Sequence, residues 1–348
     1  MEFVCYSDWK QLPDSVNKLF ATAEKESFFF SRPWFGNLVK NGLDEGQGYL
    51  LACVLDQERV VALLPLTRRD IGHYRSLKHL YTSLYTLLLA ETAQQEILAC
   101  LVQGLKRLPI YHLQLDPIAA DESNLQRLQS VMESSGFSSH RYFSFHNWIY
   151  RLQGESFTDY MATRPARVRN TIARKKRKLE REHGYHIRLY TDRNLQQAMA
   201  DYNAVYAASW KVNELYEDFI NGLATNLSQA GWLRLAILYV EYQPVAAQFW
   251  IVANGKASIF KLNYDKAWKQ YSPGSILMAF LMRHVIDNDK VDEIDFLTGN
   301  DAYKQDWMSE RRERWRLNCI NKTNPKRRRH RFTDRLDGLL KSFKKESV

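Results

Sequence analysis

The sequence predicts a mixed α/β (α+β) protein of two tandem domains, each a mixed, mostly antiparallel sheet flanked by helices. A chain of 348 residues is long enough for about two domains. In each half, helical stretches precede a strand meander, and a helix and a further strand follow it. Asn254-Gly255 joins two alternating runs in the second half, and this dipeptide is the strongest short hairpin signal. The same order of elements in both halves therefore predicts two copies of one fold.

The first copy is expected in residues 1–154. A helical stretch at Pro13–Lys25 precedes alternating runs at Tyr49–Leu55 and Arg59–Leu66, which have the pattern of an antiparallel hairpin. A helix, a short strand, a second helix and aromatic strands follow at Thr92–Arg107, Ile110–Leu115, Ser123–Ser135 and Phe137–Leu152.

The second copy is expected in residues 155–322, with a basic tail at 323–348. A basic helix, Arg164–Arg181, comes directly after the boundary near Gly154. The predicted helices and strands that follow are Leu195–Trp210, Tyr216–Ala230, Leu233–Tyr239, Pro244–Val252, Ala257–Tyr264, Ser275–Asp287, Asp292–Leu297, a short helix at Asp301–Trp307 and a strand at Arg314–Cys319.

Composition excludes several classes of protein. Apolar residues make up 45% and charged residues 25%, the ordinary balance of a soluble globular domain. The sequence contains no apolar run of the roughly 18–20 residues that span a membrane, and its start lacks the basic and apolar regions of a secretory signal. The four cysteines and nine histidines are scattered, without metal-ligand spacing. We therefore expect a cytoplasmic protein with no metal site.

The net charge of +10 is concentrated in two places. Arg164–Arg181 holds nine basic residues against one acid, and Lys322–Val348 holds ten against three. Contact with phosphate, with tRNA or with an anionic membrane surface would explain this charge, and a solvated helix face is the alternative. A basic residue near an anionic leaflet contributes roughly 1 kcal/mol, so the tail is a candidate peripheral anchor at the inner membrane. Aromatic residues are not interleaved with these basic stretches in the manner of RNA-reading motifs, and sequence-specific DNA binding is not expected.

The segment Lys269–Ser275 is the first candidate site. Ser272-Pro273-Gly274-Ser275 opens an apolar helix, and the N-terminus of a helix can hold a phosphate on free backbone N–H groups. We expect the N–H groups of Gly274, Ser275 and Ile276 to hold a donor's pyrophosphate, with Ser272 as the cap and Lys269 or Gln270 alongside. The alternative is that this segment is simply a good helix start.

Asp295 is the second candidate. It lies in the middle of an otherwise apolar strand, where a carboxylate is costly to bury without a partner. Asp295 is therefore either a general base or a structural hydrogen-bond hub. Asp301, Tyr303 and Lys304 follow the same strand, and an exposed polar turn is the alternative for these three.

Three stretches carry a resemblance to a known family. They are Arg167–Glu180 (RVRNTIARKKRKLE), Tyr271-Ser272-Pro273-Gly274 and Asp295–Lys304 (DFLTGNDAYK). The chain resembles the double-domain GNAT-superfamily acyltransferases, labelled BioF-like or CelD-like acetyltransferases and related to the Fem-type aminoacyltransferases. The resemblance covers roughly Ser156–Leu317 and, more loosely, Leu77–Leu84. One departure is that Gly274 is the only glycine of the pyrophosphate loop, where the common GNAT pattern has two.

The resemblance implies roles for the cluster after the strand. Tyr303 stands where GNAT enzymes often place the tyrosine that protonates the leaving thiolate, a group with a pKa near 8.5. Asp301 or Asp295 would accept the acceptor's proton, and Lys304 could stabilise negative charge. The donor's acyl carbonyl would need a backbone N–H from the strand Ala257–Tyr264.

Further residues are candidates for acceptor binding. Tyr81, Thr82 and Tyr85 form an aromatic and hydroxyl run suited to sugars, and Trp210 could join them. Lys261 and Asn263 could also face the pocket. Core packing is the alternative for the tyrosines, and a solvent-facing strand is the alternative for Lys261 and Asn263.

These observations favour a bacterial cytoplasmic enzyme that transfers an acyl group from acetyl-CoA or another acyl-CoA to an amine or hydroxyl. The acceptor class implied by the resemblance is a sugar, a polysaccharide precursor or a related small molecule. A Fem-type transferase that uses aminoacyl-tRNA is the nearest alternative, supported by the basic helix and the incomplete phosphate loop. A non-catalytic partner of a polysaccharide synthase at the inner membrane is the second, motivated by the basic tail.

Overall fold

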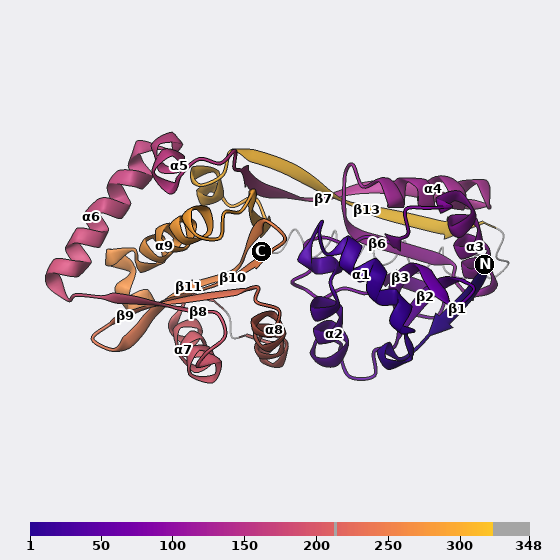
Figure 1. The fold of residues 1–348 in the computed structure, drawn as a ribbon, viewed down its shortest axis with the longest axis horizontal. Coiled ribbons are helices and arrows are strands. Elements are labelled where there is room, and N and C mark those ends of the chain that lie inside the picture. Colours follow the sequence, from indigo (N-terminus) through magenta and orange to yellow (C-terminus); the bar gives the residue numbers. More distant parts are fainter. Residues whose placement is uncertain (212–213, 323–348) are drawn as a thin grey trace, which may run out of the picture. The chain divides into compact units, whose positions relative to one another are not determined.

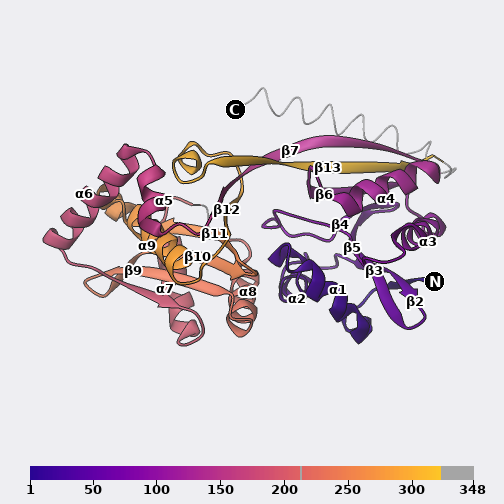
Figure 2. The same ribbon diagram turned by 45° about the horizontal axis from the view of Figure 1, so that its top comes forward.

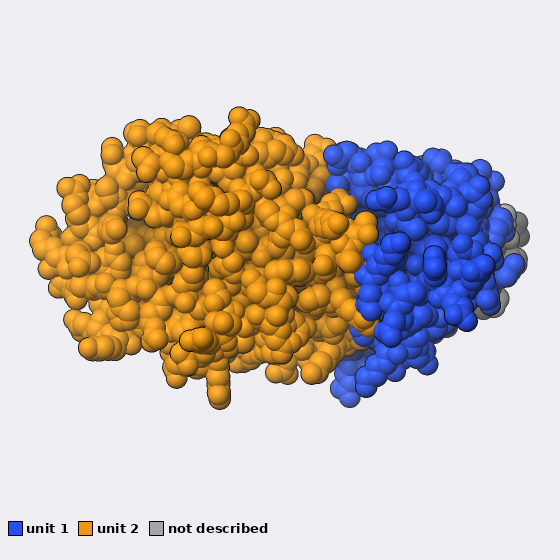
Figure 3. All heavy atoms as spheres, viewed as in Figure 1, with its two compact units in different colours: residues 1–19, 44–144, 315–348 blue, residues 20–43, 145–314 orange. Residues whose placement is uncertain are grey.

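A computed structural model describes residues 1–211 and 214–322 of the protein. The chain divides into two compact units, which Figure 3 shows in different colours. Unit 1 comprises residues 1–19, 44–144 and the chain from 315 onward, and unit 2 comprises residues 20–43 and 145–314. Both units therefore combine segments from the two halves of the sequence. The predicted basic tail at 323–348 lies outside the described residues.

The predicted repetition is present, and each half follows the order strand, two helices, three strands, helix, strand (Figure 1). The first half contains β1 (Glu2–Tyr6), α1 (Asn17–Ala23), α2 (Arg32–Asn41), β2 (Tyr49–Asp56), β3 (Arg59–Asp70), β4 (His73–Ser76), the short β5 (Leu88–Leu89), α3 (Gln94–Arg107), β6 (His112–Ala119), α4 (Ser123–Ser134) and β7 (Phe137–Arg151). Short 3-10 helices at Trp9–Gln11, Asp14–Val16 and Phe28–Phe30 lie between these elements.

The second half begins with two additional helices, α5 (Phe157–Thr163) and the basic α6 (Ala166–Glu182). It continues with β8 (His186–Tyr190), α7 (Leu195–Ala208), α8 (Glu217–Gln229), β9 (Leu233–Val240), β10 (Gln243–Ala253), β11 (Lys256–Tyr264), the 3-10 helix η4 (Lys266–Tyr271), α9 (Pro273–Asp287), β12 (Glu293–Thr298), the 3-10 helix η5 (Ala302–Asp306) and β13 (Glu310–Asn321). The second repeat thus has a 3-10 helix where the first has α4.

The strand order is the same in both repeats. The first repeat pairs its strands as β1-β2-β3-β4-β6, and the second as β8-β9-β10-β11-β12. In each, a parallel pair follows the antiparallel meander, β4 with β6 and β11 with β12. The fold is therefore a mixed α/β fold repeated in tandem, as predicted.

The last strand of each repeat is exchanged with the other repeat. The strand order reads β6-β13-β7-β12, so β13 lies between β6 and β7, and β7 lies between β13 and β12. Figure 2 shows β7 and β13 side by side along their length. Each of these strands passes from one unit into the other, β7 at residues 144–145 and β13 at residues 314–315.

Within unit 2, helices cover both faces of the sheet. Helices α5, α6 and α9 lie on one face, and α7 and α8 lie on the other (Figure 1). The core under α9 is apolar and includes Trp250, Ile294 and Leu281, all fully or almost fully buried. Burial of such side chains contributes roughly 1.5–3 kcal/mol each, and this core fixes the start of α9 against the strands.

The predictions from sequence omitted several elements. They did not include α2, although Ser31 caps it by accepting a hydrogen bond from the N–H of Trp34 at 3.3 Å. They divided β7 into strands where the structure has one strand of 15 residues. Among the described residues, no helix is long and apolar enough to cross a membrane, and no three His, Cys, Asp or Glu side chains group as metal ligands would.

Candidate functional site

The candidate site lies where two parallel strands of unit 2 separate. β11 and β12 pair over only three residue pairs, from Lys256–Glu293 to Ser258–Asp295, although β11 continues to Tyr264 and β12 to Thr298. Ligands in α/β sheets bind beyond the carboxyl ends of parallel strands. The separation therefore opens the sheet beside the N-terminus of α9, the helix that connects the two strands.

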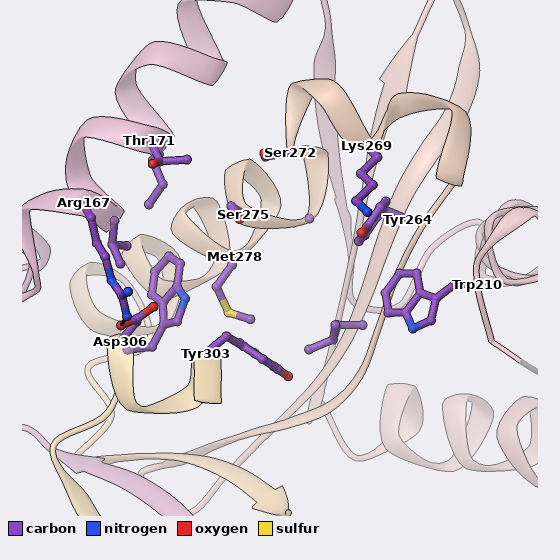
Figure 4. Close-up of a pocket in the computed structure, with 15 residues that line it drawn as sticks. Arg167, Thr171, Trp210, Tyr264, Lys269, Ser272, Ser275, Met278, Tyr303 and Asp306 are labelled. Carbon is purple, nitrogen blue, oxygen red and sulfur yellow. Dashed lines mark hydrogen bonds and ion pairs between the residues drawn. The ribbon is translucent and has the colours of Figure 1, made fainter. Parts of the chain in front are cut away.

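A cavity of about 610 Å³ occupies this place, within the usual range of small-molecule sites. Figure 4 shows Met278 and Tyr303 pointing into it, with Trp210 and Tyr264 on one side and Arg167 beside Asp306 on the other. Its described lining residues are Arg167, Val168, Thr171, Ile172, Trp210, Leu262, Tyr264, Lys269, Ser272, Gly274, Ser275, Met278, Tyr303, Asp306 and Trp307.

Five of the lining residues were predicted from sequence as donor-binding or catalytic. They are Lys269, Ser272, Gly274, Ser275 and Tyr303, and the cavity brings them together. Trp210, predicted for the acceptor, also lines it, and its ring centroid lies 4.6 Å from that of Tyr264. Gln270 and Ile276 do not line the cavity; the backbone oxygen of Gln270 accepts a hydrogen bond from Lys175, and Ile276 is buried.

The start of α9 differs from the expected anion cradle. Ser272 adopts a left-handed conformation (φ 52°) and makes no side-chain cap, and its carbonyl oxygen accepts the N–H groups of Ser275 and Ile276 at 3.0 and 3.2 Å. A phosphate that binds these two N–H groups would have to compete with the carbonyl oxygen of Ser272. The carbonyl of Gly274 accepts from Gln248 at 2.9 Å, which ties the helix start to β10. A Cβ at Gly274 would stand 3.2 Å from the ring of Tyr264, so the loop approaches the cavity wall closely.

Tyr303 provides the protic group of the cavity. Its side chain is 41% exposed, and its ring packs edge-on against Phe296 at 5.7 Å between centroids. Burial of the hydroxyl, and then the negative charge of Asp301, raises the pKa of Tyr303 above its ordinary value. The phenol is therefore protonated at neutral pH and can donate to a group in the cavity.

Lys304 does not line the cavity, and its ammonium group organises the turn after β12. It donates to the carbonyl of Thr298 at 2.5 Å and lies 3.3 Å from the carboxylate of Asp301. Burial lowers the pKa of Lys304, and the charge of Asp301 opposes that effect. Gly299 in this turn has φ 108°, a conformation that favours glycine. Lys304 and Asp301 therefore position Tyr303 and, in this structure, do not themselves line the cavity.

Asp295 is a buried hydrogen-bond hub. Its carboxylate accepts the N–H of Leu297 at 2.6 Å and the guanidinium of Arg312 at 2.7 Å, and it also accepts from the amide of Asn147. Arg312 in turn contacts Glu293 at 3.0 Å. Burial lowers the pKa of Arg312, but the charges of Asp295 and Glu293 outweigh it and raise that pKa overall. The oxygens of this carboxylate are already occupied by three donors, one of which is the guanidinium of Arg312, so the geometry favours the structural alternative for Asp295.

Alternation along β11 separates two groups of side chains. Leu262 and Tyr264 line the cavity, and Lys261 and Asn263 lie on the opposite face of the strand. There Lys261 binds Glu214 at 2.6 Å, and Asn263 lies beside Tyr202 of α7. The predicted placement of Lys261 and Asn263 in the pocket therefore does not fit the structure.

Lys211 contacts the strand edge at the cavity. Its ammonium donates to the carbonyl of Leu262 at 2.7 Å. The N–H and C=O of one strand residue point to the same edge, so the N–H of Leu262 also faces the space between β11 and β12. Burial, and then the charge of Lys261, lowers the pKa of Lys211 to about 8.

The predicted acceptor residues of the first half belong to the interior of unit 1. Tyr85 is buried and donates to the carbonyl of Pro65 at 2.6 Å. Thr82 is buried and accepts the N–H of His79 at 2.9 Å. Tyr81 is half-buried, with its ring 4.9 Å from that of His79. These contacts hold the loop after β4 and account for the hydroxyls of Tyr85 and Thr82 without a ligand.

Sequence reasoning did not find several residues of the site. Arg167 and Thr171 line the cavity from α6, and Arg167 pairs with Asp306. Their spacing of four residues on a helix could have suggested one face, but the sequence does not show which face meets α9. Asn147 and Arg312 lie 165 residues apart and meet only because β7 and β13 are neighbours.

The comparison with known families agrees with this geometry. Residues 166–305 match the family described as "Acetyltransferase (GNAT) domain", a range that contains α6, the separated strands, α9 and Tyr303. Over these residues the chain is therefore similar to GNAT acetyltransferase domains, which confirms the resemblance seen in the sequence. A search of the curated proteins found no match.

Solved structures share the fold over nearly the whole chain. FemX is 10% identical with a TM-score of 0.63, and the match covers 92% of this chain and 97% of FemX. A tandem GNAT protein from the clavulanic acid biosynthesis pathway is 12% identical with a TM-score of 0.51, covering 91% of this chain and 97% of that protein. L-PGS from Bacillus licheniformis is 10% identical, also with a TM-score of 0.51, covering 83% and 91%. At these identities the likeness establishes the tandem GNAT, Fem-like fold.

Proposed function

We propose that the protein transfers an acyl group from an acyl-CoA to an amine or hydroxyl of a small acceptor such as a sugar or a polysaccharide precursor. The observation that carries the proposal is the cavity at the separation of β11 and β12, which holds a protonated phenol beside the N-terminus of α9. Arg167 and Lys269 stand on its lining and can neutralise phosphate oxygens of the donor. The family match at residues 166–305 supports acyl transfer as the class of reaction.

The chemistry proposed is direct transfer within this cavity. The acceptor's nitrogen or oxygen attacks the thioester carbonyl, and the C–S bond breaks as the new bond forms. The N–H of Leu262 faces the space where the carbonyl would lie and can stabilise its developing negative charge. Tyr303 gives its proton to the departing sulfur, and the acceptor's proton leaves to water. Asp295 takes no part in this scheme because its carboxylate is already bound by Arg312.

The test is calorimetric titration with acetyl-CoA and with CoA, for wild type, Gly274→Asp and Lys269→Glu. Lys266→Glu is the matched control, since it makes the same charge change in the same 3-10 helix but does not line the cavity. We expect both ligands to bind wild type and the control, and binding to fall at least tenfold in the other two. Release of CoA in the presence of candidate amines and aminosugars then identifies the acceptor. Absence of binding to wild type would reject the acyl-CoA donor.

One observation favours a second candidate, a transferase that uses aminoacyl-tRNA. A strongly basic hollow of about 430 Å³ lies beside the cavity, on the exposed face of α6 that carries Arg167, Arg174 and Arg177. Contacts of this kind with nucleic acid release counterions and weaken steeply with salt. Transfer of an aminoacyl group from a mixture of charged tRNAs would favour this candidate over the first. The activity should be lost as the salt concentration rises from about 50 to 200 mM, and acetyl-CoA should support no transfer.

A further inference from the structure

A second hollow, distinct from the acyl-transfer cavity, lies between α6 and α9. Its volume is about 480 Å³, and the one residue that it shares with the cavity is Ile172. From α6 it is lined by Arg169, Ile172, Ala173 and Lys176, which are spaced i, i+3, i+4 and i+7. Residues at this spacing form one stripe on a helix. We call this hollow the α6–α9 groove.

The facing stripe of α9 has the same composition. It consists of Ile276, Ala279, Phe280 and Arg283, again at i, i+3, i+4 and i+7. Two helices ordinarily bury such stripes against each other. Here alanine stands in the middle of both stripes, and its short side chain leaves the space between the helices open.

The groove is apolar inside and basic at its edges. Nine of its twelve lining residues are apolar or aromatic, and the other three are Arg169, Lys176 and Arg283. These three side chains are exposed, and the guanidinium of Arg283 lies 4.9 Å from the centroid of the Phe157 ring. No carboxylate stands among the described residues that line the groove. An occupant must therefore combine an apolar body with negative charge.

We infer that the α6–α9 groove binds an anionic phospholipid of a membrane surface, with one acyl chain between Ala173 and Ala279 and the phosphate among Arg169, Lys176 and Arg283. An acyl chain brings no hydrogen-bonding groups, whereas a peptide would bring N–H and C=O groups that the apolar floor cannot satisfy. The chain's own residues 323–348 carry the same sign of charge as the rim, so charge complementarity does not favour them as the occupant. Filling an apolar hollow regains dispersion contacts that its lining lacks.

The test is co-sedimentation of the full chain with vesicles of phosphatidylcholine alone or mixed with phosphatidylglycerol. We expect binding to the mixed vesicles only. Each basic residue near an anionic surface contributes about 1 kcal/mol, so Arg169→Gln with Lys176→Gln should weaken binding by about 25-fold. The control pair Arg174→Gln with Arg177→Gln removes the same charge from another face of α6 and should weaken it by less than about fivefold.

A variant without any charge change tests the apolar part. Ala279→Trp fills the groove and should weaken binding to mixed vesicles at least tenfold. If the tryptophan disturbs folding, Ala279→Leu replaces it as the test, because the smaller leucine fills the groove partly and should weaken binding partly. Circular dichroism and the unfolding midpoint establish that each variant is folded. Equal weakening by the two glutamine pairs, or full binding by folded Ala279→Trp and Ala279→Leu, would overturn the proposal. Binding of a tRNA mixture by the protein, without binding to vesicles, would also overturn the proposal, because the basic face would then bind RNA.

Discussion

Asp295 offers the sharpest test of the reasoning, because its two interpretations predict opposite results. As a general base it would act on the reaction and contribute little to the fold. As a hub it holds β12, β7 and β13 together through Leu297, Asn147 and Arg312. The substitution Asp295→Asn keeps the shape of the side chain and removes its charge, so it separates the two roles.

The expected loss of stability follows from the contacts. The asparagine oxygen can still accept the N–H of Leu297, which lies 2.6 Å from the present carboxylate. The same oxygen keeps the amide of Asn147, so the NH₂ group replaces the oxygen that accepts from Arg312, and donor meets donor there. Loss of a charge-assisted hydrogen bond costs about 1.5–3 kcal/mol, and removing one partner of a buried ion pair costs about 3–5 kcal/mol. Glu293 still pairs with Arg312 at 3.0 Å and limits the damage, so we expect about 2–4 kcal/mol.

Urea unfolding and initial rates measured on the same preparations decide the question. We expect a lower unfolding midpoint and, at a temperature where the variant is folded, a kcat within about threefold of wild type. Asp292→Asn is the control, since Asp292 is exposed directly before the same strand and should change stability by less than about 0.5 kcal/mol. Unchanged stability with a kcat reduced by 10²-fold or more would refute the hub and restore Asp295 as the base.

Two further predictions concern the cavity and its edge. Tyr303→Phe should lower kcat by about 10²-fold and leave KM within a few-fold, measured from CoA release; an unchanged kcat would remove Tyr303 from the mechanism. Lys211 has its pKa lowered to about 8, below its ordinary value near 10.4, so between these values the unfolded chain binds a proton that the folded chain has released. The contribution of Lys211 to stability should therefore increase with pH. Between pH 7.5 and 9.5 the free energy of unfolding of wild type, measured with urea, should rise by about 2 kcal/mol relative to that of Lys211→Met. A constant difference between the two proteins would show that Lys211 titrates normally.

The repeat was predictable because its signals are local. The Asn-Gly dipeptide at Asn254-Gly255 does join two antiparallel strands, β10 and β11, and the alternating runs at Tyr49–Leu55 and Arg59–Leu66 correspond to β2 and β3. Helix α2 was missed because its stabilising contacts are distant in sequence. Asn37 donates to the carbonyl of Phe219 at 2.9 Å, and Trp34 packs edge-on against the same phenylalanine.

The candidate site was predictable where it depends on one short segment and not where it depends on strand geometry. Lys269, Ser272, Gly274 and Ser275 meet in one cavity because they belong to one loop and helix start. Lys261 and Asn263 lie on the face of β11 opposite Leu262 and Tyr264, and which of these two faces meets the cavity depends on how the strand is packed. The partners of Asp295 come from β7 and β13, and sequence spacing carries no information about that adjacency.

The exchanged strands have a consequence for how the protein is made. Unit 1 is built on β1–β6, yet β6 pairs with β4 on one side only, and the strand on its other side is β13, which ends at residue 321. A ribosome that has released the first 154 residues has therefore supplied neither the second neighbour of β6 nor the two strands that flank β7. An open strand edge is a template for wrong pairing. The first half must wait, with that edge unpaired, until almost the last described residue has been synthesised, so a chain stopped at the repeat boundary should aggregate instead of yielding a working domain.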